Sequence, residues 1–197
     1  MADKDRMDLR AVVFGVSAGG FKALHTILPE FPKDFPCPIL IVQHRKGSED
    51  HFLEQSLDSK CPLPVQEARD KEPLKRSRIY IAPGDYHLLV EKDLSLSLSY
   101  DDPICYARPS IDVLFQSASR AFEEHLIGVI LTGANSDGSN GIRTIKRNKG
   151  LTIAQDPETA HAGIMPRSAV ETQCIDFILP LEEIPPFIIG LLEETHG

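Results

Sequence analysis

The chain has 197 residues, of which 42% are hydrophobic and 25% charged, and its formal net charge is −8. This length suits one globular domain whose core needs no metal or disulfide to hold it together, and the acidic balance argues against a nucleic-acid binder. No apolar run approaches the roughly 18 residues of a membrane span, and the N-terminus is too charged for a signal peptide, so we expect a cytoplasmic protein without membrane insertion.

Short apolar runs alternate with segments of helical periodicity along most of the chain, a pattern typical of parallel strands joined by crossover helices. In chain order, strands are expected at 11–16, 39–42, 126–131, 151–154 and 176–179. Three of the helices have apolar faces that the sequence marks clearly: Phe21, Leu24 and Leu28; Phe52, Leu53 and Leu57; and Ile111, Leu114, Phe115, Ala118 and Phe122. Further helices are expected after Asp137, near 168–172 and past Pro185.

The segment from Arg78 to Tyr100 departs from this alternation. It holds three strand-like pieces, RIYIAP, YHLLVE and LSLSLSY, and the last alternates leucine with serine at the period of a strand that has one solvated face. Turn residues separate the pieces. We therefore expect an antiparallel hairpin appended to the parallel sheet.

Together these elements predict an α/β fold, a doubly wound and mainly parallel sheet flanked by helices, with the appended hairpin. One domain is expected over 11–194, after an N-terminal lead at 1–10, because no linker, repeat or low-complexity tract divides the chain. The four cysteines stand far apart, without the spacing of metal ligands, and are expected to be reduced and mostly buried: Cys37, Cys61, Cys105 and Cys174.

The first strand ends in a turn of small residues, GVSAGG, that leads into a helix. Ligands of open parallel sheets bind beyond the carboxyl ends of the strands, and Ser17 in this turn would be exposed beside the N–H groups of the helix start. Three interpretations stay open: a nucleophilic serine, a phosphate cradle and a structural turn. A P-loop would need lysine directly after glycine, and Ser17 stands where the dinucleotide fingerprint needs glycine.

Polar residues also follow two other strands. His44 comes directly after ILIVQ, and Asp137 lies in the loop after LIGVIL. Each has an ordinary alternative, a surface histidine and a helix N-cap. A serine, a histidine and an aspartate at the carboxyl ends of strands nevertheless form the constellation for nucleophilic acyl transfer. The segment Gly15 to Gly19 also fits the G-x-S-x-G elbow of α/β-hydrolases, but in that fold the acid precedes the histidine, and here the order is reversed.

Seven motifs make the chain resemble a known family. They are GVSAGG with Ser17, IVQH with His44, IAPGDYHL from Ile81, RPSIDVLF from Arg108, GVILTGANSDGSNG from Gly128, TIAQD from Thr152 and MPRSA from Met165. From about Ala11 to Leu192 the chain resembles the catalytic domain of the chemotaxis-receptor methylesterases (CheB). These enzymes remove methyl groups from glutamyl methyl esters on receptor signalling helices, and some also deamidate receptor glutamines.

The resemblance implies a serine hydrolase with a doubly wound α/β fold, in which Ser17 is the nucleophile, His44 the general base and Asp137 the acid that orients it. It implies methylated chemoreceptor helices as the partner and substrate, and no metal or organic cofactor. Residues assigned to oxyanion or substrate binding are Ala18, Gly19, Gly133, Ala134, Arg108 and Met165. For Arg108 a solvated or helix-flanking role is the alternative to substrate binding. His87 and His161 are interpreted as structural.

The sequence departs from the family pattern close to the predicted site. Ala18 replaces the usual Thr after the nucleophile, Ala134 and Asn135 replace Met-Gly, and Ile164 replaces the Gly before MPR. Two alternatives therefore remain: an interaction module that has lost catalysis, and a general small-ester hydrolase. Family members usually carry a receiver domain ahead of the catalytic domain. The first strand starts about ten residues from Met1, which leaves no room for a receiver. Three alternatives stay open: a stand-alone esterase switched by a separate receiver-type regulator as a further partner, an esterase that is not switched at all, and an excised domain.

Overall fold

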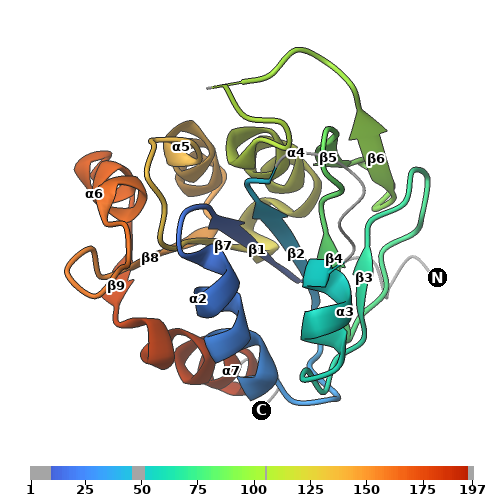
Figure 1. Cartoon of the computed structure of the whole chain (residues 1–197), viewed down its shortest axis with the longest axis horizontal. Coiled ribbons are helices and arrows are strands. Elements are labelled where there is room, and N and C mark those ends of the chain that lie inside the picture. The colour runs from blue at the N-terminus through green and yellow to red at the C-terminus, as the bar shows by residue number, and fades with distance from the viewer. Residues whose placement is uncertain (1–9, 46–51, 105, 195–197) are drawn as a thin grey trace.

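The structure, a computed structural model, describes residues 10–45, 52–104 and 106–194. Within these segments a seven-stranded parallel sheet has the order β3-β4-β2-β1-β7-β8-β9 (Figure 1). Its strands are β1 (Ala11–Val16), β2 (Pro38–Gln43), β3 (Val65–Glu67), β4 (Arg78–Ile81), β7 (Leu126–Ile130), β8 (Leu151–Gln155) and β9 (Phe177–Leu179). The helices are α2 (Gly20–Ile27), α3 (Phe52–Asp58), α4 (Ile111–Phe122), α5 (Ser139–Arg147), α6 (Ile164–Glu171) and α7 (Ile184–Glu194). Short 3₁₀ segments lie at Leu28–Glu30, Glu123–His125 and Leu181–Glu183.

Helices cover both faces of the sheet. Side chains of β1 alternate between two cores, because Val12 and Phe14 pack with α2, α3 and α7, whereas Ala11 and Val13 pack with α4, α5 and α6. Burial on both faces explains why the central strands are continuous apolar runs. The predicted doubly wound α/β fold is therefore confirmed. No helix in the described segments is long and apolar enough to span a membrane.

The predicted hairpin is also confirmed. Strands β5 (His87–Val90) and β6 (Leu96–Ser99) pair antiparallel, and Leu88 and Leu96 pack into the core on the α4 side of the sheet. The first strand-like piece of this region, RIYI, joins the parallel sheet as β4 instead. Strand β3 was not predicted, because only Val65 of its three residues is buried and so short a strand carries no periodic signal.

Two aromatic residues that were predicted on buried helix faces are exposed. Phe21 is 44% and Phe52 61% exposed, and their rings stack with centroids 5.8 Å apart. Helix α2 begins on the sheet at Gly20, so its buried face consists of residues in register with that glycine: Ala23, Leu24 and Ile27. The prediction is therefore wrong for Phe21, whereas Leu24 and Leu28 of the same predicted face are buried. Helix α6 also begins earlier than predicted, at Ile164.

The described cysteines are unpaired thiols. Cys37 is buried, whereas Cys61 and Cys174 are only half-buried, so the prediction of mostly buried cysteines is wrong for these two. Burial raises the pKa of Cys37 to about 12 and that of Cys61 to about 11, which keeps both protonated at neutral pH. Cys105 lies outside the described residues.

The strand order reverses at β1, and this positions the site. The chain moves outward from β1 to β2 on one side, and β7 lies on the other, with Val16 opposite Gln43 and Gly15 opposite Ile130. Such a switch point is where open α/β sheets bind ligands. The carboxyl ends of β2, β1 and β7, which carry the three predicted catalytic residues, therefore lie side by side.

Candidate active site

Ser17 lies directly beyond β1, in a turn that is held by hydrogen bonds to both its N–H and its carbonyl group. Its N–H donates to the carbonyl of Thr132 (2.9 Å), and its carbonyl accepts from Gly20 N–H (2.8 Å) and from the Gln43 side chain (3.0 Å). Gly19 has a φ of 81°, and a Cβ there would lie 2.7 Å from the Cβ of His161. Only glycine meets both conditions, so this turn holds the Ser17 hydroxyl in a fixed position at the start of α2.

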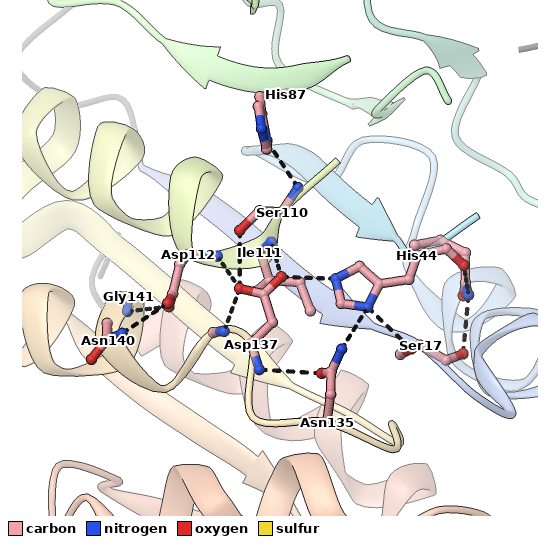
Figure 2. Close-up of polar contacts among 12 residues, drawn as sticks. Ser17, His44, His87, Ser110, Ile111, Asp112, Asn135, Asp137, Asn140 and Gly141 are labelled. Atoms are coloured by element: carbon pink, nitrogen blue, oxygen red, sulfur yellow. Dashed lines mark hydrogen bonds and ion pairs between the residues drawn. The ribbon is translucent and has the colours of Figure 1, made fainter. Parts of the chain in front are cut away.

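His44 connects the other two predicted residues. It follows β2, where its N–H donates to the carbonyl of Val16 (3.0 Å). Its Nδ1 lies 3.1 Å from Ser17 Oγ, and its Nε2 lies 2.8 Å from Asp137 Oδ2 (Figure 2). Because the Asp137 carboxylate can only accept hydrogen bonds, the ring proton belongs on Nε2, and the Nδ1 lone pair faces the serine hydroxyl. The structure thus brings Ser17, His44 and Asp137 together in one hydrogen-bonded chain.

The Asp137 carboxylate is fully buried and accepts five hydrogen bonds from residues that the structure describes. Besides His44, the donors are the N–H groups of Ile111 (2.7 Å), Asp112 (3.0 Å) and Gly138 (3.0 Å) and the hydroxyl of Ser110 (3.0 Å). Burial by itself would raise the pKa of Asp137, but the hydrogen bonds from His44 and the backbone outweigh it and hold the pKa below its ordinary value. Asp137 therefore stays ionised at neutral pH and can stabilise a positive charge on His44.

Asp137 also explains how α4 and α5 are joined. The alternative that it caps its own helix does not hold, because the N-cap of α5 is Gly138 and no side chain caps that end. Asp137 caps the neighbouring helix α4, and Asp112 of α4 in return accepts from the Gly141 N–H in α5 (2.7 Å) and from the side chain of Asn140 (3.1 Å). The carboxylate before α5 thus binds the start of α4, and the carboxylate in α4 binds the start of α5. These reciprocal hydrogen bonds fix the position of Asp137.

A second histidine, His87, contacts Ser110, which in turn binds Asp137. His87 is 1% exposed, and its Nδ1 accepts the N–H of Ser110 at 3.1 Å while its Nε2 lies 3.2 Å from the Asp102 carbonyl. Ser110 in turn donates its hydroxyl to Asp137. His87 therefore acts on the site through Ser110, in keeping with its interpretation as structural. His161 is exposed, with its ring against Gly19.

The predicted oxyanion donors differ in availability. The N–H groups of Ala18, Gly19 and Ala134 donate to no acceptor in the described parts of the chain. The N–H of Gly133, by contrast, donates to the carbonyl of Ala162 (2.8 Å), so the prediction that this group holds an oxyanion is wrong. Met165 is fully buried against Gly133, where a Cβ would lie 2.6 Å from its sulfur, so its side chain supports the loop and does not meet a substrate.

A cleft of about 740 Å³ opens beside His44, and its lining includes Arg45, Arg108 and Asn135. Arg45 forms ion pairs with Glu54 and Glu67, both at 2.7 Å, so its charge is neutralised.

Arg108 is held differently. Its guanidinium lies 3.8 Å from the centre of the Tyr100 ring and donates to the carbonyls of Tyr100 and Asp101. Since carbonyls and a ring do not cancel a positive charge, Arg108 keeps its positive charge at the cleft, whose lining also includes Asp85.

Asn135 was predicted to lie close to the site, as a departure from the family pattern, but no function was assigned to it. Its side-chain oxygen accepts the Asp137 N–H (3.2 Å), and its Nδ2 lies 3.3 Å from His44 Nδ1. Ser110 and Asp112 were also missed as parts of the site. The signal for them was present in RPSIDVLF, where a serine and an aspartate interrupt the start of an otherwise apolar helix face.

Comparisons with known proteins agree with this geometry. The family model described as CheB methylesterase matches residues 12–188. A relative from Leptospira interrogans is 49% identical over 185 residues, which cover 94% of this chain and 96% of the relative. The protein-glutamate methylesterase/protein-glutamine glutaminase of Clostridium acetobutylicum is 37% identical over 93% of this chain, which spans only 53% of that protein.

A solved structure is similar as well. The crystal structure of the Thermotoga maritima CheB methylesterase catalytic domain superimposes with a TM-score of 0.90 and 38% identity, covering 93% of this chain and 99% of that one. The fold, the family match and the relatives agree with one another and with the resemblance drawn from the motifs. The chain belongs to the CheB methylesterase family.

Proposed function

We propose that this protein is a protein-glutamate methylesterase that also has glutaminase activity. The observation that carries the proposal is His44, which bridges the Ser17 hydroxyl and the buried, ionised Asp137 within the fold of the CheB catalytic domain. Relatives such as the Clostridium acetobutylicum protein bear both activities in their names. Methyl esters and amides of glutamate share the acyl carbon that such a serine attacks.

The first half of the reaction forms an acyl-enzyme. Ser17 Oγ attacks the ester carbonyl carbon while its proton moves to His44 Nδ1, and the carbonyl electron pair moves onto the oxygen. Asp137 holds the Nε2 proton and stabilises the imidazolium. When the oxyanion collapses, the bond to the methoxy oxygen breaks, and that oxygen takes the proton from Nδ1 and leaves as methanol.

The second half repeats these steps with water. Water gives a proton to His44 Nδ1 as its oxygen attacks the glutamyl ester of Ser17, and Ser17 then leaves with that proton. In both halves the N–H groups of Ala18 and Ala134 are the donors we assign to the oxyanion, since neither has another acceptor in the described chain. A well-placed donor of this kind lowers the barrier by about 3 kcal/mol.

Methylated chemoreceptor helices are the proposed substrate, and Arg108 is proposed to bind their acidic side chains. Because the enzyme carries a net charge of −8, it approaches acidic helices against its own field, and the positive charge of Arg108 at the cleft offsets this locally. A cytoplasmic location and a separate receiver-type regulator are further parts of the proposal that rest on family membership.

Replacing Arg108 tests the substrate assignment. We expect Arg108→Gln to raise KM for a methylated receptor fragment about tenfold while kcat changes little, because a charge-assisted contact to the substrate is lost and the triad is not touched. The effect should shrink at high salt. Arg120→Gln, an exposed arginine in the last turn of α4, is the matched control. An unchanged KM in Arg108→Gln would leave Arg108 with a structural role only.

The proposed function is tested by product release. Purified protein is incubated with a receptor fragment that carries either glutamyl methyl esters or glutamines, and methanol and ammonia are measured. We expect methanol from the first and ammonia from the second. Much faster turnover of simple aryl esters than of the fragment would indicate a general esterase. No turnover, together with no labelling by a serine-directed phosphonate, would indicate an interaction module.

A further inference from the structure

Asn135 occupies a position that the mechanism leaves unused. The Asp137 N–H needs an acceptor and takes the Asn135 side-chain oxygen at 3.2 Å, which fixes the orientation of the amide. The Asn135 Nδ2, a donor only, therefore has to face His44 Nδ1, and it lies 3.3 Å away (Figure 2). Asn135 and His44 both line the cleft of about 740 Å³.

Two donors share one lone pair in the resting site. His44 Nδ1 has a single lone pair, and both the Ser17 hydroxyl (3.1 Å) and the Asn135 amide (3.3 Å) are directed at it. When the serine proton moves to Nδ1, this nitrogen becomes a donor and no longer accepts from Asn135. The Asn135 N–H is then released at the moment when the protonated His44 faces the leaving group.

We propose that Asn135 is a specificity-determining residue that favours an ester over an amide leaving group. This inference rests on the proposed function of the site. In the tetrahedral intermediate the methoxy oxygen carries two lone pairs, so it can accept one hydrogen bond from His44 Nδ1 and a second from Asn135 Nδ2. Charge then builds on that oxygen as the C–O bond breaks, and the second donor stabilises it before the proton arrives.

An amide leaving group does not match this pair of donors. Its nitrogen has two N–H bonds and only one lone pair, and that lone pair must take the His44 proton for ammonia to leave. The Asn135 N–H then faces a nitrogen without a free lone pair. The N–H bonds of the leaving nitrogen therefore meet the N–H bonds of Asn135, and neither group can accept a hydrogen bond from the other. The two donors therefore assist methanol release, and the second one hinders ammonia release.

The test compares two variants on one receptor fragment that carries a methyl ester or a glutamine at the same position. Asn135→Ala removes the amide. Asn135→Ser also removes it but keeps an oxygen that can accept the Asp137 N–H two residues on. We expect both variants to lower the ratio of kcat/KM for ester over amide by about tenfold, mainly through slower ester turnover. Ser136→Ala, an exposed neighbour on the same loop, should leave the ratio unchanged.

Several outcomes would overturn the inference. An unchanged ratio in Asn135→Ala would show that the amide does not sense the leaving group. A wild-type ratio in Asn135→Ser, with a lowered ratio in Asn135→Ala, would show that Asn135 acts only by holding the loop. If the wild-type protein hydrolyses neither substrate, the proposed function fails and this inference fails with it. If the wild-type protein hydrolyses the ester but the ratio is unchanged in Asn135→Ala, only this inference fails.

Discussion

Ser17→Ala is expected to lower the rate of methanol release from a methylated receptor fragment by at least about 10⁴-fold. The hydroxyl is the only atom of the described site placed to attack a substrate within reach of His44 Nδ1, and alanine leaves no nucleophile for that base to activate. Because His44 is the only hydrogen-bond partner of the Ser17 hydroxyl among the described residues, while the Ser17 N–H and carbonyl hold the turn, the variant should fold normally.

Labelling with a serine-directed phosphonate gives a second measurement of the same expectation. Wild-type protein should be labelled once and lose activity in parallel, and Ser17→Ala should not be labelled. His44→Ala should be labelled far more slowly, since the general base is gone. Full methanol release by a folded Ser17→Ala protein would contradict the assignment of the nucleophile and, with it, the acyl-enzyme mechanism.

Asp137→Asn is expected to lower kcat by about 10⁴-fold and also to destabilise the fold. An amide has one acceptor atom where the carboxylate serves five donors, so its nitrogen must face N–H groups of His44 or α4. If His44 adapts by moving its proton to Nδ1, it can no longer accept the serine proton. Leaving buried donors unpaired costs about 1–3 kcal/mol of unfolding free energy.

The stability part of this expectation depends on pH. The folded-state pKa of Asp137 lies below its ordinary value of 3.8, so the carboxylate stabilises the fold above about pH 4 and loses this contribution as the pH falls through its lowered pKa. The difference in unfolding free energy between wild type and Asp137→Asn, measured with urea, should therefore be largest near neutral pH and shrink below pH 4.

Asp176→Asn is the matched control for Asp137. Hydrogen bonds from Lys146 and from Thr152 outweigh burial and lower the pKa of Asp176 too, but this carboxylate joins α5 to β8 away from the triad. We expect Asp176→Asn to reduce stability with the same dependence on pH and to leave kcat unchanged. An equal loss of kcat in both variants would mean that Asp137 acts through stability alone.

The three triad candidates could be found from the sequence because each stands in the first polar segment after a buried apolar run. Parallel strands place such segments at one edge of a sheet, so Ser17, His44 and Asp137 needed only the correct strand order to meet. The orientation of His44 could not be found in this way. Which ring nitrogen faces the serine depends on side-chain torsions, and no spacing in the sequence encodes them.

The support of the triad was predicted less well, since it depends on contacts between helices. Asp137 caps α4 although α5 follows it directly in the chain. This capping is possible only because α4 and α5 lie side by side with their N-termini next to each other. Phe21 was misplaced for a related reason: its spacing to Leu24 and Leu28 fits a helix face, but the contact of Gly20 with the sheet decides which face is buried. In both cases tertiary packing overrides the local pattern.

The position of β1 between β2 and β7 also governs when activity can appear. The contact between His44 and Asp137 joins residues 93 positions apart in the chain, and β7 pairs with β1 only after α4 has crossed the sheet. During synthesis, a chain that has emerged as far as β6 already has its nucleophile and base but lacks the acid and the strand beside them. Hydrolysis therefore has to wait until β7 and the loop that carries Asp137 have emerged and joined β1, and enzymatic turnover reports that this pairing is complete.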